Sequence, residues 1–170
     1  MCGIIGYTGT QPVIDILAKG LARLEYRGYD SAGIAVIGDD DCIKTTKTAG
    51  KIALLQERLD TEGNLSGTTG IGHTRWATHG RPTEENAHPH TDSTGDIVVV
   101  HNGIVENYLT LRAELEKSGS EFSTDTDTEV IAHLVAEFSK KGITLEEALR
   151  LAIQKMQGIF ALALISRRDP

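Results

Sequence analysis

The chain begins Met1-Cys2-Gly3-Ile4-Ile5-Gly6-Tyr7, a short apolar stretch with a cysteine directly behind the initiator methionine. Because cysteine is small, an aminopeptidase usually removes a methionine in front of it. Cys2 would then carry both a thiol and a free α-amine. The amine titrates near about pH 8 and the thiol near about pH 8.5, so the amine can accept the thiol proton during nucleophilic attack. The stretch therefore predicts a nucleophile that carries its own base.

A free cysteine is also a small apolar residue that proteins often bury, so Cys2 could instead begin an ordinary buried strand. Five further blocks of glycine, polar and charged residues favour the first interpretation. They are Tyr26-Arg27-Gly28-Tyr29-Asp30-Ser31-Ala32-Gly33, Gly72-His73-Thr74-Arg75-Trp76-Ala77-Thr78-His79-Gly80, Asn86-Ala87-His88-Pro89-His90, His101-Asn102-Gly103 and Asp125-Thr126-Asp127-Thr128-Glu129.

In this order the blocks resemble the class II glutamine amidotransferase domain, whose members are N-terminal-nucleophile hydrolases. Within that class, the forms at 26–33 and 74–80 resemble the glutamine:fructose-6-phosphate aminotransferase family, also called glucosamine-6-phosphate synthases. The resemblance runs from Cys2 to about the end of the chain. It implies that L-glutamine is hydrolysed to glutamate and ammonia through a thioester on Cys2. In a full-length enzyme the ammonia would serve glucosamine 6-phosphate synthesis.

The predicted strands and helices come in clusters, which indicates an α+β fold. The resemblance implies the four-layer α-β-β-α sandwich of the N-terminal-nucleophile hydrolases. We interpret residues 1–170 as an incomplete glutaminase domain, truncated at its C-terminus. The chain stops at 166–170 directly after a predicted strand, whereas the family's domain continues with further strands and a sugar-phosphate isomerase domain. That second domain is absent from this chain.

Hydrophobic periodicity locates the main elements. Apolar residues at helical spacing predict a helix from Pro12 to about Arg23, with proline in its first turn. Further helices are predicted over 50–60, 130–138 and 145–156, the last one preceded by a capping box of Thr144 and Glu147. Predicted strands cover 33–37, 42–47, 97–100 and 159–165, and a hairpin turn covers 38–41. The run at 97–100 suits a central strand buried on both faces.

Hydrolysis of an amide places negative charge on its oxygen, so the site needs well-placed hydrogen-bond donors. By resemblance, the side-chain amide of Asn102 and the backbone N–H of Gly103 form this oxyanion hole. An Asn-Gly pair is also a common hairpin turn, which is the structural alternative.

A free amino acid needs a cation for its α-carboxylate and an anion for its α-ammonium group. The planar guanidinium of Arg75 suits the carboxylate, and by resemblance it occupies the family's matching position. By resemblance Asp127 binds the ammonium group, although it could also cap the helix that follows. Thr78 and His79 match substrate-binding positions whose loop closes over glutamine, with Gly80 as a hinge.

Two further features leave alternatives open. Trp76 is either a buried core aromatic residue or, by resemblance, a gate that governs the passage of ammonia to the second domain. Arg27 and Asp30 either lie near the nucleophile or form a surface ion pair, and neither is assigned a catalytic role. Five of the six histidines lie within one 29-residue stretch, but their spacing matches no zinc pattern, so we expect no metal and no cofactor.

Composition limits the partners. A chain of 170 residues with 39% hydrophobic content can bury a core, and a net charge of −7 argues against nucleic acid or an anionic membrane. No apolar run reaches the length of a transmembrane helix, and no signal peptide is visible, so we expect a cytoplasmic protein. The expected partners are L-glutamine and, only through the missing domain, fructose 6-phosphate. The full-length form is expected to be a homo-oligomer.

Two alternative functions follow from the same residues. The chain could be the glutaminase domain of another class II amidotransferase, such as an amidophosphoribosyltransferase. It could also be a non-catalytic glutamine-binding regulatory module, which retention of Met1 would favour.

Overall fold

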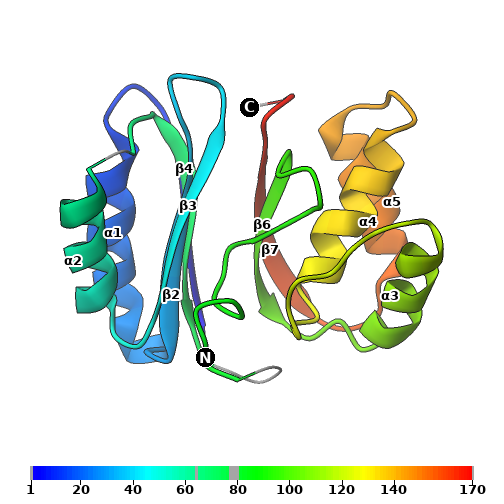
Figure 1. Cartoon of the computed structure of the whole chain (residues 1–170), viewed down its shortest axis with the longest axis horizontal. Coiled ribbons are helices and arrows are strands. Elements are labelled where there is room, and N and C mark those ends of the chain that lie inside the picture. The colour runs from blue at the N-terminus through cyan, green and yellow to red at the C-terminus, as the bar shows by residue number, and fades with distance from the viewer. Residues whose placement is uncertain (1, 64, 77–80, 170) are drawn as a thin grey trace.

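The computed structural model describes residues 2–63, 65–76 and 81–169. These residues form four layers: a pair of helices, a four-stranded sheet, a three-stranded sheet and a second group of helices (Figure 1). The two sheets face each other, and the helices cover their outer faces (Figure 1). The expected α-β-β-α sandwich is therefore confirmed. Within the described residues, no helix combines the length and the apolar character needed to cross a membrane.

The first sheet has the strand order β1-β4-β2-β3, and all its neighbouring strands are antiparallel. Its strands are β1 (Gly3–Thr8), β2 (Ser31–Ile37), β3 (Ile43–Ala49) and β4 (Thr69–Arg75). In the β1–β4 pair, Gly3 lies opposite Thr74. This register brings the beginning of the chain to the end of β4, where two of the predicted site residues, Arg75 and Trp76, lie.

Helices α1 (Val13–Leu24) and α2 (Ile52–Glu62) cover the outer face of this sheet (Figure 1). Their positions agree with the predicted helices, and a short 3₁₀ helix at Glu25–Arg27 follows α1. On α1, Val13, Leu17 and Leu21 recur at helical spacing and are fully buried. On α2, Leu55 is fully buried in the same cluster. Apolar burial therefore fixes both helices against the sheet.

The second sheet has the order β5-β6-β7, from β5 (His90–Thr91), β6 (Ile97–Gly103) and β7 (Phe160–Ser166). Strand β6 is central, as its apolar run predicts, and its first four residues are at most 4% exposed. It pairs along its whole length with β7, where Gly103 lies opposite Phe160. Strand β5 pairs with β6 only at Thr91 and His90, opposite Val98 and Val99. Among the described residues, the far end of β6 therefore has a strand neighbour on one side alone.

Helix α4 (Glu129–Ser139) lies against the second sheet, and helices α3 (Tyr108–Lys117) and α5 (Leu145–Lys155) pack against α4 (Figure 1). Thr144 caps α5 as predicted, because its Oγ1 accepts the backbone N–H of Glu147 at 3.3 Å. The sequence interpretation missed α3, strand β4 and the two-residue strand β5. The peptide segment of β4, Thr-Gly-Ile-Gly-His-Thr-Arg, contains one large apolar residue and two glycines, so it shows no strand-like alternation.

The space between the sheets changes in character along the strands. At one end it is filled by apolar side chains, including Ile37, Ile71, Val98 and Val100. Side chains alternate between the two faces of a strand, so His73 follows Ile71 on the inner face of β4, and Asn102 follows Val100 on the inner face of β6. The same pleat that builds the apolar core therefore brings polar side chains face to face at the other end.

Candidate active site

A pocket at this polar end brings together residues from several distant segments of the chain. Its lining includes Cys2, Arg75, Trp76, Gly103, Asp127 and Thr128. These residues come from the start of β1, the end of β4, the end of β6 and the loop before α4. Most of the residues predicted to form the site therefore share one pocket.

Cys2 is held by four hydrogen bonds. Its Sγ–H donates to the backbone carbonyl oxygen of Trp76 at 3.6 Å. Its Sγ accepts the backbone N–H of Trp76 at 3.2 Å. Its carbonyl oxygen accepts Arg27 Nε–H and Asn102 Nδ2–H, each at 3.3 Å. Arg27 therefore lies beside Cys2, as one of the two sequence alternatives expected, although the sequence assigned it no catalytic role.

Asn102 and Gly103 end β6 and do not form a hairpin turn. The backbone of Gly103 has φ +123°, a conformation that favours glycine. A Cβ at this position would lie 2.3 Å from the carbonyl oxygen of Ile159, so space also requires glycine. The Asn-Gly turn alternative is therefore wrong.

The histidines of the site form a buried, hydrogen-bonded cluster. The rings of His73 and His88 stack with centroids 4.0 Å apart. His88 Nδ1 accepts the backbone N–H of His101 at 3.2 Å, beyond the point where β5 stops pairing with β6. Thr128 Oγ1 lies 2.9 Å from His101 Nδ1 and 3.4 Å from His88 Nε2. Side chains therefore replace a strand partner at the active-site end of β6.

Burial keeps these rings neutral. It lowers the pKa of His73 to about 4, although contacts with Asn102 and the His101 carbonyl oppose the shift. Burial also lowers the pKa of His88 and His90 well below the ordinary value. In the part of the chain that the structure describes, no group of three or more His, Cys, Asp or Glu side chains is arranged to hold a metal ion. The hydrogen bonds give the cluster a structural explanation instead.

Arg75 and Asp127 supply opposite charges to one pocket. Arg75 is 4% exposed, and its Nη1 donates to the carbonyl oxygen of Arg81 at 3.2 Å. Burial lowers the pKa of Arg75, while the neighbouring Cys2, Asp127 and Asp30 oppose that shift. An arginine remains cationic in proteins, so the pocket has a fixed positive charge.

Asp127 is anchored to the backbone of a different segment. Its Oδ2 accepts the N–H of Val105 at 2.8 Å, and the side chain is 5% exposed. The N-cap of α4 is Thr128, and its side chain makes no capping hydrogen bond. The helix-cap alternative for Asp127 is therefore wrong.

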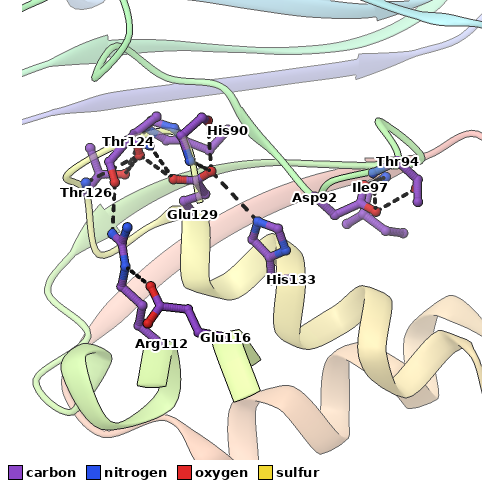
Figure 2. A network of polar contacts seen from close by, with 11 residues as sticks. His90, Asp92, Thr94, Ile97, Arg112, Glu116, Thr124, Thr126, Glu129 and His133 are labelled. Atoms are coloured by element: carbon purple, nitrogen blue, oxygen red, sulfur yellow. Dashed lines mark hydrogen bonds and ion pairs between the residues drawn. The ribbon is translucent and has the colours of Figure 1, made fainter. Parts of the chain in front are cut away.

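The loop that carries Asp127 is tied to the first residue of α4. Glu129 Oε1 accepts the N–H of Ser123 at 2.8 Å. Its Oε2 accepts the N–H and Oγ1–H of Thr124 at 2.8 and 2.7 Å (Figure 2). Burial opposes ionisation of Glu129, but nearby His133 and these donors outweigh it and lower the pKa to about 2. Sequence reasoning missed this role, although Glu129 stands in a quoted block.

Two groups of predicted residues need separate comment. Thr78, His79 and Gly80 lie outside the described residues. Trp76 is 45% exposed and makes an edge-to-face contact with Tyr29, with ring centroids 5.5 Å apart. It is therefore not a buried core residue.

Comparisons with known proteins agree with this geometry. A family model described as a glutamine amidotransferase domain matches residues 73–170. The glutamine–fructose-6-phosphate aminotransferases (isomerizing) of Thermococcus kodakarensis and Streptomyces coelicolor are 54% and 51% identical to this chain over 170 residues. Each alignment covers 100% of this chain but only 28% of the relative.

Solved structures share the fold. A glutamine phosphoribosylpyrophosphate amidotransferase from B. subtilis is 28% identical with a TM-score of 0.82, over 98% of this chain and 35% of that one. A glutamine aminotransferase class-II domain protein from silicibacter pomeroyi has a TM-score of 0.65 at 16% identity, over 98% of this chain and 73% of that one. The second likeness supports the fold alone.

The buried histidines predict a loss of stability in acid. Unfolded His73 binds a proton below about pH 6.5, whereas the folded residue stays neutral down to about pH 4. Acidification across this window therefore favours the unfolded state, and His73 alone should lower the free energy of unfolding by up to about 3 kcal/mol. Urea titrations at several pH values measure the slope of the free energy of unfolding against pH. His73→Phe should show a shallower slope, and an unchanged slope would contradict this assignment.

Proposed function

The chain belongs to the glutamine amidotransferase domain family, and from this premise we propose that it hydrolyses the side-chain amide of L-glutamine with Cys2 as nucleophile. The observation that carries the proposal is the position of Cys2 Sγ. It accepts a backbone N–H at 3.2 Å and shares one pocket with Arg75, Gly103 and Asp127. A nucleophile, oxyanion donors and two opposite charges are what glutamine hydrolysis requires.

The reaction begins after removal of Met1. Cys2 Sγ attacks the side-chain carbonyl carbon of glutamine, and the α-amine of Cys2 takes the thiol proton. The carbon–sulfur bond forms, and the carbonyl electrons move onto oxygen. The amine then gives its proton to the leaving nitrogen, the carbon–nitrogen bond breaks, and ammonia departs. Water adds to the remaining thioester, and breakage of its carbon–sulfur bond releases glutamate and the thiol.

Asn102 and Gly103 are proposed as the oxyanion donors. Asn102 Nδ2 lies on the Cys2 side of its amide, 3.3 Å from the Cys2 carbonyl oxygen, and an NH₂ group has a second hydrogen to offer. Gly103 borders the pocket that contains Cys2. Donors that are already oriented stabilise the developing charge without reorganising during the reaction.

Arg75 and Asp127 are proposed to hold the amino-acid end of glutamine, with Thr78 and His79 completing the substrate site. A guanidinium can grip the α-carboxylate with two parallel bonds. Asp127 uses one carboxylate oxygen for Val105, and its charge is available to the α-ammonium group. The half-exposed Trp76 is proposed as a gate at the edge of the pocket.

We also propose that the ammonia aminates fructose 6-phosphate in a longer protein. The relatives that are about half identical are named glutamine–fructose-6-phosphate aminotransferases, and this chain spans 28% of their length. A reducing cytoplasm suits this activity, because the nucleophile is a thiol and both cysteines, Cys2 and Cys42, are free.

Cys2→Ala should abolish glutamine hydrolysis while glutamine binding persists, because the charged residues that hold the substrate remain. Glutamate release measures the first quantity and titration calorimetry the second. Cys42→Ala is the matched control and should retain normal turnover. A variant that carries one extra residue before Cys2 and is otherwise unchanged should also be inactive, because Cys2 then has no free amine. Undiminished turnover by Cys2→Ala would disprove the mechanism.

Arg75→Lys and Asp127→Asn should each raise the KM for glutamine. Lysine cannot form the two-bond fork, and asparagine keeps the acceptor for Val105 but loses the charge. Removing one partner of a buried charge pair costs about 2 to 5 kcal/mol, so at least a tenfold rise in KM is expected for Asp127→Asn. The effect on kcat should be smaller, because these contacts hold ground state and transition state alike. Arg23→Lys on α1 is the control, and unchanged KM in both site variants would refute this placement.

A full-length protein that carries this segment should form glucosamine 6-phosphate from glutamine and fructose 6-phosphate. Product analysis by mass spectrometry, with fructose 6-phosphate or phosphoribosyl pyrophosphate as the acceptor, tests this. Formation of phosphoribosylamine instead would favour the amidophosphoribosyltransferase alternative. Glutamine binding without turnover by protein from which Met1 has been removed would favour the regulatory alternative.

A further inference from the structure

His73 is a fully buried polar residue in the site that the proposed mechanism does not use. It lies on the inner face of β4, and its Nε2 is 2.8 Å from Asn102 Oδ1 and 3.1 Å from the backbone carbonyl oxygen of His101. It therefore links the two sheets at the residue proposed to stabilise the oxyanion.

The backbone carbonyl determines the direction of both hydrogen bonds. The oxygen of His101 can only accept, so Nε2 of His73 must carry a hydrogen and donate. The atom of Asn102 that faces the same Nε2–H must then also be an acceptor, which identifies it as Oδ1. His73 Nδ1 is buried and has no hydrogen-bond partner among the described residues. A neutral ring with its hydrogen on Nε2 satisfies this arrangement.

The orientation of the Asn102 amide follows. With Oδ1 on His73, Nδ2 points to the Cys2 carbonyl oxygen, 3.3 Å away. In the flipped amide, Oδ1 would face the Cys2 oxygen, and both of these groups are acceptors. Nδ2 would face Nε2–H of His73, and both of those groups are donors. The flip would therefore lose two hydrogen bonds and create two repulsive contacts.

The His73 ring is itself held in place. It stacks on His88 with an interplanar angle of 14°, and His88 is fixed by the backbone N–H of His101. Strand β4 lies between β1 and β2 in the first sheet. The donor on His73 therefore has little freedom to follow a rotating amide.

We propose that His73 is a positioning residue for catalysis: its Nε2–H holds the Asn102 amide so that N–H, and not the carbonyl oxygen, faces the reacting group. This inference rests on the proposed glutaminase function. A flipped Asn102 would present a lone pair to the developing negative charge and would oppose the reaction. His73 acts through Asn102 and does not touch the substrate.

A double-mutant cycle tests the inference. Asn102→Ala should lower kcat about 100- to 1000-fold, the usual effect of losing an oxyanion donor. His73→Phe keeps the ring but removes the donor, and it should lower kcat about 10- to 100-fold with KM changed less than about twofold. In the Asn102→Ala background, His73→Phe should cause no further loss, because its effect passes through the missing amide. Equal losses in both backgrounds would overturn the inference.

Two further variants separate positioning from loss of stability. His73→Gln retains an amide N–H near the position of Nε2 and should recover at least part of the kcat that His73→Phe loses. Leu55→Ala removes a fully buried side chain of α2 on the outer face of the same sheet, and it should keep normal kcat when measured well below its melting temperature. A kcat for His73→Gln as low as that of His73→Phe would count against the donor role.

A measurement without turnover completes the test. Nitrogen NMR of histidine-labelled wild-type protein should show the hydrogen of His73 on Nε2 and none on Nδ1. The opposite tautomer would overturn the inference even if His73→Phe fails to fold. The proposed function has a separate test, and it is refuted if Cys2→Ala still hydrolyses glutamine. An inactive Cys2→Ala combined with equal His73→Phe losses in both Asn102 backgrounds would refute only the role of His73.

Discussion

The two-residue period of facing strands is the constraint on which the rest of the structure depends. Because side chains alternate between faces, the inner positions of β4 continue from Ile71 to His73 and then to Arg75. Those of β6 continue from Val100 to Asn102. Packing of the apolar residues fixes the spacing of the sheets, and this spacing brings the polar residues within hydrogen-bond distance. Packing in the hydrophobic core thus determines the distances between the polar residues of the site.

The polar end of the sandwich is held by two kinds of anchor, neutral histidine rings and a charged carboxylate. Burial keeps the histidine rings neutral, and a neutral ring has one donor and one acceptor. The carboxylate of Glu129 is instead charged, because the donors of Ser123 and Thr124 that surround it favour the ionised form. These hydrogen bonds also hold the loop before α4 in place. Neutral and charged anchors therefore position two sides of the same pocket.

Local sequence patterns predicted much of the fold but little of the site's internal geometry. Helices α1 and α4 and the buried run of β6 have strong periodicity, so their existence could be predicted. Strand β4 is rich in glycine, and α3 buries only Leu111 and Leu115, so both patterns were too weak to recognise. The contacts of Arg27 with Cys2 and of His73 with Asn102 join segments 25 and 29 residues apart. Only tertiary packing determines such contacts, and no local pattern encodes them.

The strand order of the first sheet also has a consequence for the timing of synthesis. Among the described residues, β1 pairs only with β4, which lies more than sixty residues further along the chain. At about 5 to 20 residues per second, a ribosome needs several seconds to reach β4 after making β1. During that interval the first strand has no partner, and its end is open to an aminopeptidase. Removal of Met1, on which the proposed mechanism depends, can therefore precede the folding step that places Cys2 beside Trp76.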